Sequence, residues 1–115
     1  MRRNLADRSE SRARALEVRL QEARADFERI VQHIIAAYHP TRVYQWGSLV
    51  DGAHFTERSD IDIAVEGVRD AESFFAMLRD ASSMTRFSVD LVQMETIHPV
   101  FVESIKERGR VVYER

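Results

Sequence analysis

The chain has 115 residues, a formal net charge of −2 and no cysteine. A chain of this length buries a core without cross-links, and the lack of cysteine excludes both a disulfide framework and a thiolate metal site. The weak negative charge argues against nucleic acid as a major partner, and no apolar run approaches the ~20 residues of a membrane span. We therefore expect one cytoplasmic domain over residues 1–115, without a membrane segment or a signal peptide.

The N-terminal third predicts a single long helix over residues 7–38. Residues 1–38 contain neither glycine nor proline, and apolar residues recur at steps of three and four. This stripe consists of Leu16, Leu20, Ala23, Phe27, Ile30 and Ile34. Its second half is apolar enough to cover a sheet. The outer half either projects into solvent or uses Leu16, Leu20 and Ala23 as a seam for another helix, from a second copy of the chain or a helical partner.

Residues 43–46 predict the first strand, which ends at Gly47 and Ser48. A glycine lets the backbone approach a phosphate group closely, and exposed N–H groups at a turn attract anions. Gly47 and Ser48 are therefore candidates to hold phosphate. Arg58, in the loop that follows, either contacts a polyphosphate through its guanidinium group or is simply solvated.

The second predicted strand, over residues 59–65, carries two carboxylates. Side chains alternate along a strand, so Asp60 and Asp62 project to one face while Ile61 and Ile63 project to the other. Two carboxylates about 7 Å apart by Cα are unfavourable unless water, a cation or a base neutralises them, and a divalent metal is the simplest of these explanations. Oxygen donors alone suit Mg²⁺ or Mn²⁺ rather than zinc. A phosphate cradle followed by a metal-binding carboxylate pair indicates phosphoryl or nucleotidyl transfer.

The rest of the chain predicts a helix over 71–80, a strand over 86–94, a helix over 96–108 and a short strand over 111–113. The helix residues expected to face the core are Phe74, Phe75, Met77, Leu78, Val100, Phe101 and Ile105. The expected fold is of the α+β class, with a small mixed β-sheet and helices packed on one face, preceded by the long N-terminal helix.

Asp90 is the one carboxylate within the strand over 86–94, and apolar residues flank it. Burying an unpaired carboxylate is costly, so beside Asp60 and Asp62 it would act as a third metal ligand. The alternative is a surface aspartate on a solvated sheet face.

Gly47-Ser48, a spacer and then Asp60-Ile61-Asp62 resemble the signature of the DNA polymerase beta-like nucleotidyltransferases. The short chain is similar to their minimal nucleotidyltransferase (MNT) branch over residues 28–113. Two features depart from the family pattern: the spacer of eleven residues, 49–59, is one residue longer than usual, and Leu49 stands where many members carry a basic residue.

The resemblance implies a nucleotidyltransferase fold, ATP as donor, and Asp60, Asp62 and Asp90 as the catalytic, metal-binding carboxylates. It also implies an all-helical HEPN ribonuclease as partner, for which the chain would be the antitoxin, attaching AMP to a hydroxyl group of the toxin. Two other readings stay open. The chain could be a non-catalytic binding module that neutralises its partner by complex formation, or the acidic pair could be structural in a non-enzymatic domain.

Overall fold

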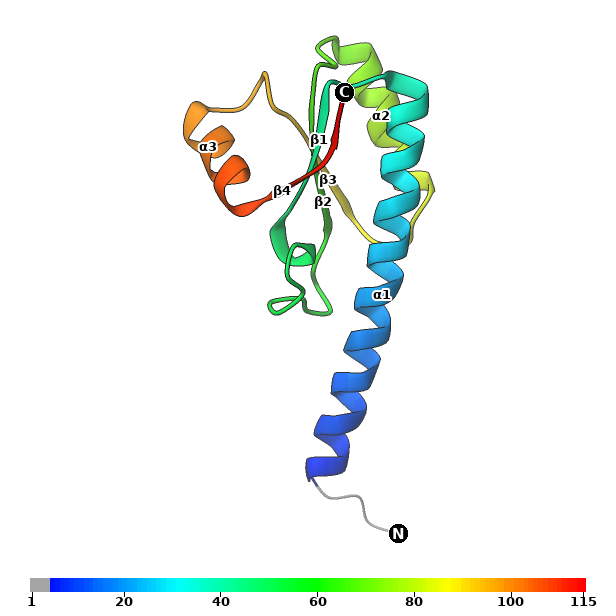
Figure 1. The fold of residues 1–115 in the computed structure, drawn as a ribbon. Coiled ribbons are helices and arrows are strands. Elements are labelled where there is room, and N and C mark those ends of the chain that lie inside the picture. Colours follow the sequence, from blue (N-terminus) through cyan, green and yellow to red (C-terminus); the bar gives the residue numbers. More distant parts are fainter. Residues whose placement is uncertain (1–4) are drawn as a thin grey trace.

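The computed structural model describes residues 5–115. Its elements are α1 (Leu5–Tyr38), β1 (Arg42–Trp46), the short 3-10 turn η1 (Gly47–Leu49), β2 (Ile61–Glu66), α2 (Ala71–Ser83), β3 (Val89–Gln93), α3 (Pro99–Arg108) and β4 (Arg110–Glu114) (Figure 1). The strands form a sheet of order β3-β2-β1-β4, in which β2 and β3 are parallel and the other pairs are antiparallel. This confirms the expected α+β class with a mixed sheet and a long N-terminal helix.

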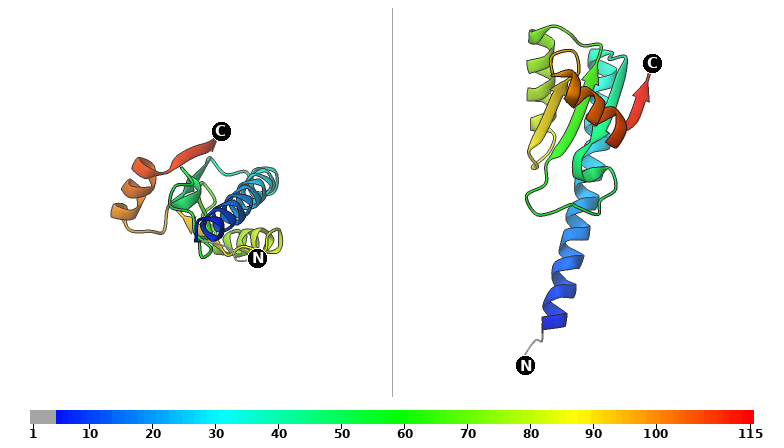
Figure 2. Two further views of the ribbon diagram at one scale, coloured as in Figure 1. Left: turned by 90° about the horizontal axis from the view of Figure 1, so that it is seen from below. Right: turned by 90° about the vertical axis from the view of Figure 1, so that its left-hand side faces the viewer.

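The two faces of the sheet are covered by different helices (Figure 2). Because side chains alternate along β2, Ile61 and Ile63 join the core beneath α1 and α2, whereas Ala64 faces the other way. On that second face Ala64 and Tyr44 pack against Ile105 of α3. The sequence predicted helices on one face only. The structure differs from this prediction, because the apolar side chains of α3 pack on the face of the sheet that α1 and α2 leave uncovered.

Helix α1 runs well beyond the sheet at its N-terminal end (Figure 1). Leu20 and Ala23 are only 6% and 1% exposed, and together with Phe27 they belong to the core of the same chain. The prediction that they form a seam for another helix is therefore wrong for these two residues. The reason is the loop between β1 and β2, whose Phe55 is buried in the same cluster and closes over this part of α1.

Helices α2 and α3 each begin at a side-chain cap. Asp70 Oδ2 accepts a hydrogen bond from the N–H of Ser73 at 2.8 Å, and His98 Nδ1 accepts one from Val100 at 3.1 Å. Three of the apolar residues predicted to face the core are instead more than 60% exposed: Phe75, Val100 and Phe101. The helical period explains this, since the faces that contact the sheet are set by Met77 in α2 and by Val102 and Ile105 in α3.

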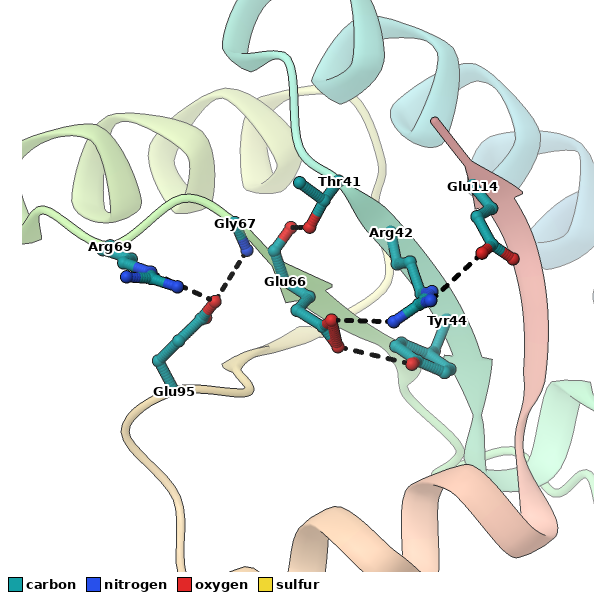
Figure 3. A network of polar contacts seen from close by, with 8 residues as sticks. All are labelled: Thr41, Arg42, Tyr44, Glu66, Gly67, Arg69, Glu95 and Glu114. Atoms are coloured by element: carbon teal, nitrogen blue, oxygen red, sulfur yellow. Dashed lines mark hydrogen bonds and ion pairs between the residues drawn. The ribbon is translucent and has the colours of Figure 1, made fainter.

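A polar network joins three strands at the end of the sheet where β1 begins (Figure 3). Arg42 donates to Glu66 of β2 at 3.1 Å and to Glu114 of β4 at 3.0 Å, and the hydroxyl of Tyr44 donates to Glu66 at 3.4 Å. The network is a structural one, because Gly47 and Ser48 follow the opposite end of β1. No helix within residues 5–115 combines the length and the apolar character that a membrane crossing requires.

Candidate active site

The three predicted carboxylates lie at the end of the sheet where the parallel strands β2 and β3 begin. Asp62 of β2 is in register with Asp90 of the parallel strand β3. On its other side Asp62 pairs with Trp46, the last residue of β1. Asp60 immediately precedes β2 and lies two residues from Asp62, so the strand alternation directs both to the face that α3 partly covers. Asp60 and Asp90 are exposed, whereas Asp62 is partly buried.

Among the three carboxylates, Asp62 is the one whose charge is poorly solvated. The pKa of Asp62 is raised to about 7, chiefly because its carboxyl group is buried and also because the Asp90 and Asp60 carboxylates lie nearby. A free carboxylate has a pKa near 4, so the site holds one group that resists ionisation at neutral pH. A bound cation would reverse this effect, because it favours the charged form.

Gly47 brings the end of β1 into direct contact with this group. Its φ of +74° lies in the left-handed region, which glycine adopts without steric penalty. A Cβ atom at Gly47 would overlap the Oδ2 atom of Asp62. From the sequence, the expected reason for a glycine at this position is close approach of the backbone to a phosphate group. The structure adds a second reason for glycine, because no side chain fits between the turn and the Asp62 carboxylate.

Ser48 presents a polar atom that the protein leaves unpaired. Its hydroxyl oxygen is buried and makes no hydrogen bond with any described residue. It borders a cavity of about 450 Å³ that lies between the turn η1 and helix α3. The residues that line this cavity are Trp46, Gly47, Ser48, Val50, Asp51, His54, Ser104, Ile105 and Arg108. Since buried polar atoms are normally paired, the unpaired Ser48 hydroxyl is an exception within this part of the fold.

The donor set fits a hard divalent cation. Asp60, Asp62 and Asp90 offer only carboxylate oxygens, which suit Mg²⁺ or Mn²⁺. Within residues 5–115, no three His, Cys, Asp or Glu side chains form a ready-made metal cluster. Mg²⁺ commonly binds one or two carboxylates and completes its shell with water and substrate phosphate, so a complete protein cage is not required. The crowding that raises the pKa of Asp62 is what such an ion would relieve.

The long spacer does not displace Gly47 from Asp62. Its length is taken up in successive turns, in which the N–H of Gly52 donates to Ser48 at 3.1 Å and that of Ser59 donates to Thr56 at 3.1 Å. Leu49 is 1% exposed and belongs to the core. The position where the family often carries a basic residue therefore points away from the cavity in this chain.

Arg58 lies apart from the cavity at Gly47 and Ser48. It is exposed, and it lines a separate hollow with Arg12 and Leu16 of α1. The cation that does border the cavity is Arg108, which the sequence reasoning did not single out. The only sequence signal for Arg108 is its place in the last turn of a helix, and nothing local shows that this helix end meets the turn after β1.

The fold and the site agree with a comparison against protein families. The family described as "Polymerase beta, Nucleotidyltransferase" matches residues 28–115, which include all three aspartates and the Gly47 turn. The chain belongs to this family. A comparison with curated protein sequences gave no significant match.

Solved structures with the same fold come from toxin–antitoxin complexes. A toxin–antitoxin with AMP-PNP is 23% identical, with a TM-score of 0.64, over 76% of this chain and 73% of that one. A MntA–HepT complex is 19% identical, with a TM-score of 0.62, over 80% and 73%. The tri-AMPylated HEPN toxin of Shewanella oneidensis in complex with MNT antitoxin is 19% identical, with a TM-score of 0.62, over 81% and 73%. At these identities the likeness establishes the fold that this nucleotidyltransferase domain shares with them.

Proposed function

We propose that this chain transfers a nucleoside monophosphate, AMP from ATP, to a hydroxyl group of a partner protein. We further propose that the partner is a HEPN-type toxin and that the chain is its antitoxin. The observation that supports transfer most directly is the contact between Gly47 and Asp62, with Asp90 in register beside Asp62. This contact places a turn that can bind phosphate next to carboxylates that can bind a divalent cation.

Each residue has a distinct role in this proposal. The backbone at Gly47 and the hydroxyl of Ser48 bind the β- and γ-phosphates of the donor. Asp60 and Asp62 would hold Mg²⁺, which would supply charge neutralisation for the transfer. Asp90 either joins them as a ligand or accepts the proton of the attacking hydroxyl. That hydroxyl oxygen bonds to the α-phosphorus, the bond between the α-phosphorus and the bridging oxygen breaks, and pyrophosphate leaves.

The acceptor is proposed to be a protein for two reasons. The chain carries a net charge of −2, which gives no electrostatic footprint for a nucleic-acid substrate. One of the complexes that share its fold contains a tri-AMPylated HEPN toxin bound to MNT antitoxin. An AMP-accepting helical protein is therefore the partner class to test first.

The test is label transfer from α-³²P-ATP with Mg²⁺, with the protein encoded by the neighbouring gene as acceptor. We expect label on the acceptor with the wild-type chain and none with the Asp60→Asn, Asp62→Asn double variant. The double variant Glu103→Gln, Glu107→Gln, which removes two exposed carboxylates of α3, serves as the charge-matched control and should transfer label normally. Labelling that persists in the double variant would place the chemistry elsewhere.

A second function, neutralisation by binding alone, is favoured by one observation. Leu49 is buried, so the phosphate turn supplies no cation of its own for a triphosphate. Under this reading the double variant would still bind and silence the toxin as well as the wild type does. Toxin activity measured with either form, beside the label-transfer assay, separates the two functions.

A further inference from the structure

The cavity above the Gly47 turn has one wall from the turn itself and the other from the C-terminal half of α3. Ser104, Ile105 and Arg108 contribute the α3 wall, and the volume is about 450 Å³. This is within the size range of pockets that bind small molecules. Ser48, whose buried hydroxyl oxygen has no partner among the described residues, lines the same cavity. The cavity therefore contains an unmet hydrogen-bonding group next to an anion-binding type of turn.

Arg108 is a cation without a partner of its own. Its guanidinium group makes no hydrogen bond or ion pair with any residue in the described part of the chain. The next arginine, Arg110, is different, since it donates to Gln45 Oε1 at 3.0 Å. Arg108 also stands in the last turn of α3, where the helix dipole favours positive charge whether or not a ligand is present. Arg108 is thus an exposed residue with a free guanidinium group that lines the cavity from the end of a helix.

The negative charges around the cavity favour a positively charged side chain at the position of Arg108. Asp60, Asp62 and Asp90 stand on one side of the Gly47 turn, and a triphosphate that lies across it adds several negative charges. A metal ion at the carboxylates neutralises only the phosphates that it touches. Leu49 is buried, and Asp51, which also lines the cavity, is acidic and accepts a hydrogen bond from Ala53 at 2.9 Å. Among the lining residues, Arg108 is the one that is always positively charged.

We infer that Arg108 of α3 is a binding residue for the β- and γ-phosphates of the donor nucleotide, reaching across the cavity to the phosphate held at Gly47 and Ser48. This rests on the proposed function for the presence of a triphosphate in the site. A guanidinium group provides paired donors that match phosphate oxygens, which an ammonium group cannot reproduce. Helix α3 would thus supply the charge that the turn lacks.

The experiment compares Mg–ATP and AMP binding by titration calorimetry for the wild type, Arg108→Gln, Arg108→Lys and Lys106→Gln. Lys106 is the matched control, because it is exposed in the same last turn of α3 and does not line the cavity. We expect Arg108→Gln to weaken Mg–ATP binding by about ten- to a hundredfold, the size of a lost charge-assisted contact. AMP binding should stay within about threefold of wild type. Arg108→Lys should fall between wild type and Arg108→Gln, and Lys106→Gln should match wild type.

Each contrary outcome has a definite meaning. Equal Mg–ATP affinity in Arg108→Gln and Lys106→Gln would overturn the inference and leave the proposed transfer intact. A parallel loss of AMP affinity would also overturn it, because AMP lacks the β- and γ-phosphates. If the wild type binds none of ATP, GTP, CTP and UTP with Mg²⁺, both the inference and the proposed function fail. If binding depends on Arg108 but no acceptor is labelled, the inference stands and transfer fails.

Discussion

Gly47 and Asp62 are in direct contact, so a side chain at position 47 would displace the Asp62 carboxylate. Asp62 is partly buried beside Asp60 and Asp90, which raises its pKa to about 7. Gly47 adopts φ +74° with its Cα against the Asp62 carboxylate. The sequence predicted a phosphate-binding role for Gly47 and a metal-binding role for Asp62. Their contact follows from the pairing of β1 with β2, in which Trp46 lies opposite Asp62.

Gly47→Ala tests this contact. The positive φ alone costs about 1–2 kcal/mol for an L-residue, and the new methyl group would displace the Asp62 carboxylate. We expect a lower melting temperature and a loss of label transfer of a hundredfold or more, about 3 kcal/mol in the transition state. Gly52→Ala is the matched control, with φ +76° in the same loop but against Leu20 and Arg24. A similar loss of activity in both variants would show that loop strain, and not the Asp62 contact, is responsible.

Asp62→Asn tests the charge crowding through stability. A carboxyl group whose folded-state pKa is raised stabilises the fold below its unfolded pKa, and this contribution is lost as pH rises from about 4 through about 7. A rise of three units corresponds to about 4 kcal/mol when unscreened, and solvent screening of this partly exposed side chain reduces it to about 1–2 kcal/mol.

In EDTA we therefore expect Asp62→Asn to be more stable than wild type by about 1–2 kcal/mol at pH 8 and equal to it at pH 4. Urea unfolding at the two pH values measures this, with Glu103→Gln as the charge control. A variant that is less stable than wild type at pH 8 would contradict the charge crowding. Added Mg²⁺ should stabilise the wild type at pH 8 and leave Asp62→Asn unchanged.

At the scale of elements, the sequence did not show how the eleven-residue spacer between β1 and β2 folds. Its turns carry it back onto α1, where Arg24 Nη2 donates to the carbonyl of Leu49 at 3.3 Å and Arg19 Nη2 donates to that of Glu57 at 3.2 Å. Leu49 and Phe55 anchor it in the core. The additional residue relative to the family pattern therefore lies in a loop that is fixed to α1 and to the core. The turn at Gly47 still contacts Asp62.

Leu49→Lys tests whether this position could serve as a phosphate contact. Because the Leu49 side chain is buried among apolar residues, we expect a loss of about 3 kcal/mol or more in the free energy of unfolding and no gain in Mg–ATP affinity. Ala53→Lys adds the same charge at an exposed position of the same loop and should change stability by about 0.5 kcal/mol or less. Tighter Mg–ATP binding in a stable Leu49→Lys variant would show that the position can face the cavity.

For the whole molecule, α1 is both an outward projection and a part of the core. Its first turns project beyond the sheet, whereas Leu20, Ala23 and Phe27 are buried with the spacer and the sheet. The family match begins at residue 28, so it omits these three core residues. The outer half of α1, with Val18 58% exposed, is the part we propose for contact with a partner or a second copy.

Two truncations test this division. Removal of residues 1–14 should leave the free energy of unfolding within about 1 kcal/mol of wild type, because the side chains described in this segment, those of residues 7–14, are mainly exposed. Removal of residues 1–27 should prevent stable folding, since the lost Leu20 and Phe27 contacts contribute about 2–5 kcal/mol each against a typical total of 5–15 kcal/mol. Circular dichroism and thermal melts measure both. A chain of residues 28–115 that melts like the wild type would show that the fold is independent of α1 up to that point.

The sequence by itself determined the element types, and it predicted the chemistry that we propose for the site. Apolar periodicity, together with the glycine and proline positions, predicted each helix and strand to within a few residues. The alternation along β2 placed Asp60 and Asp62 on one face, since these signals are local. Only the tertiary structure decided which strands are neighbours, and so that Asp90 is in register with Asp62. It also decided that α3 covers the opposite face, that Leu20 and Ala23 are buried, and that Arg108 rather than Arg58 borders the cavity. These outcomes depend on contacts between residues far apart in the chain, which no local pattern encodes.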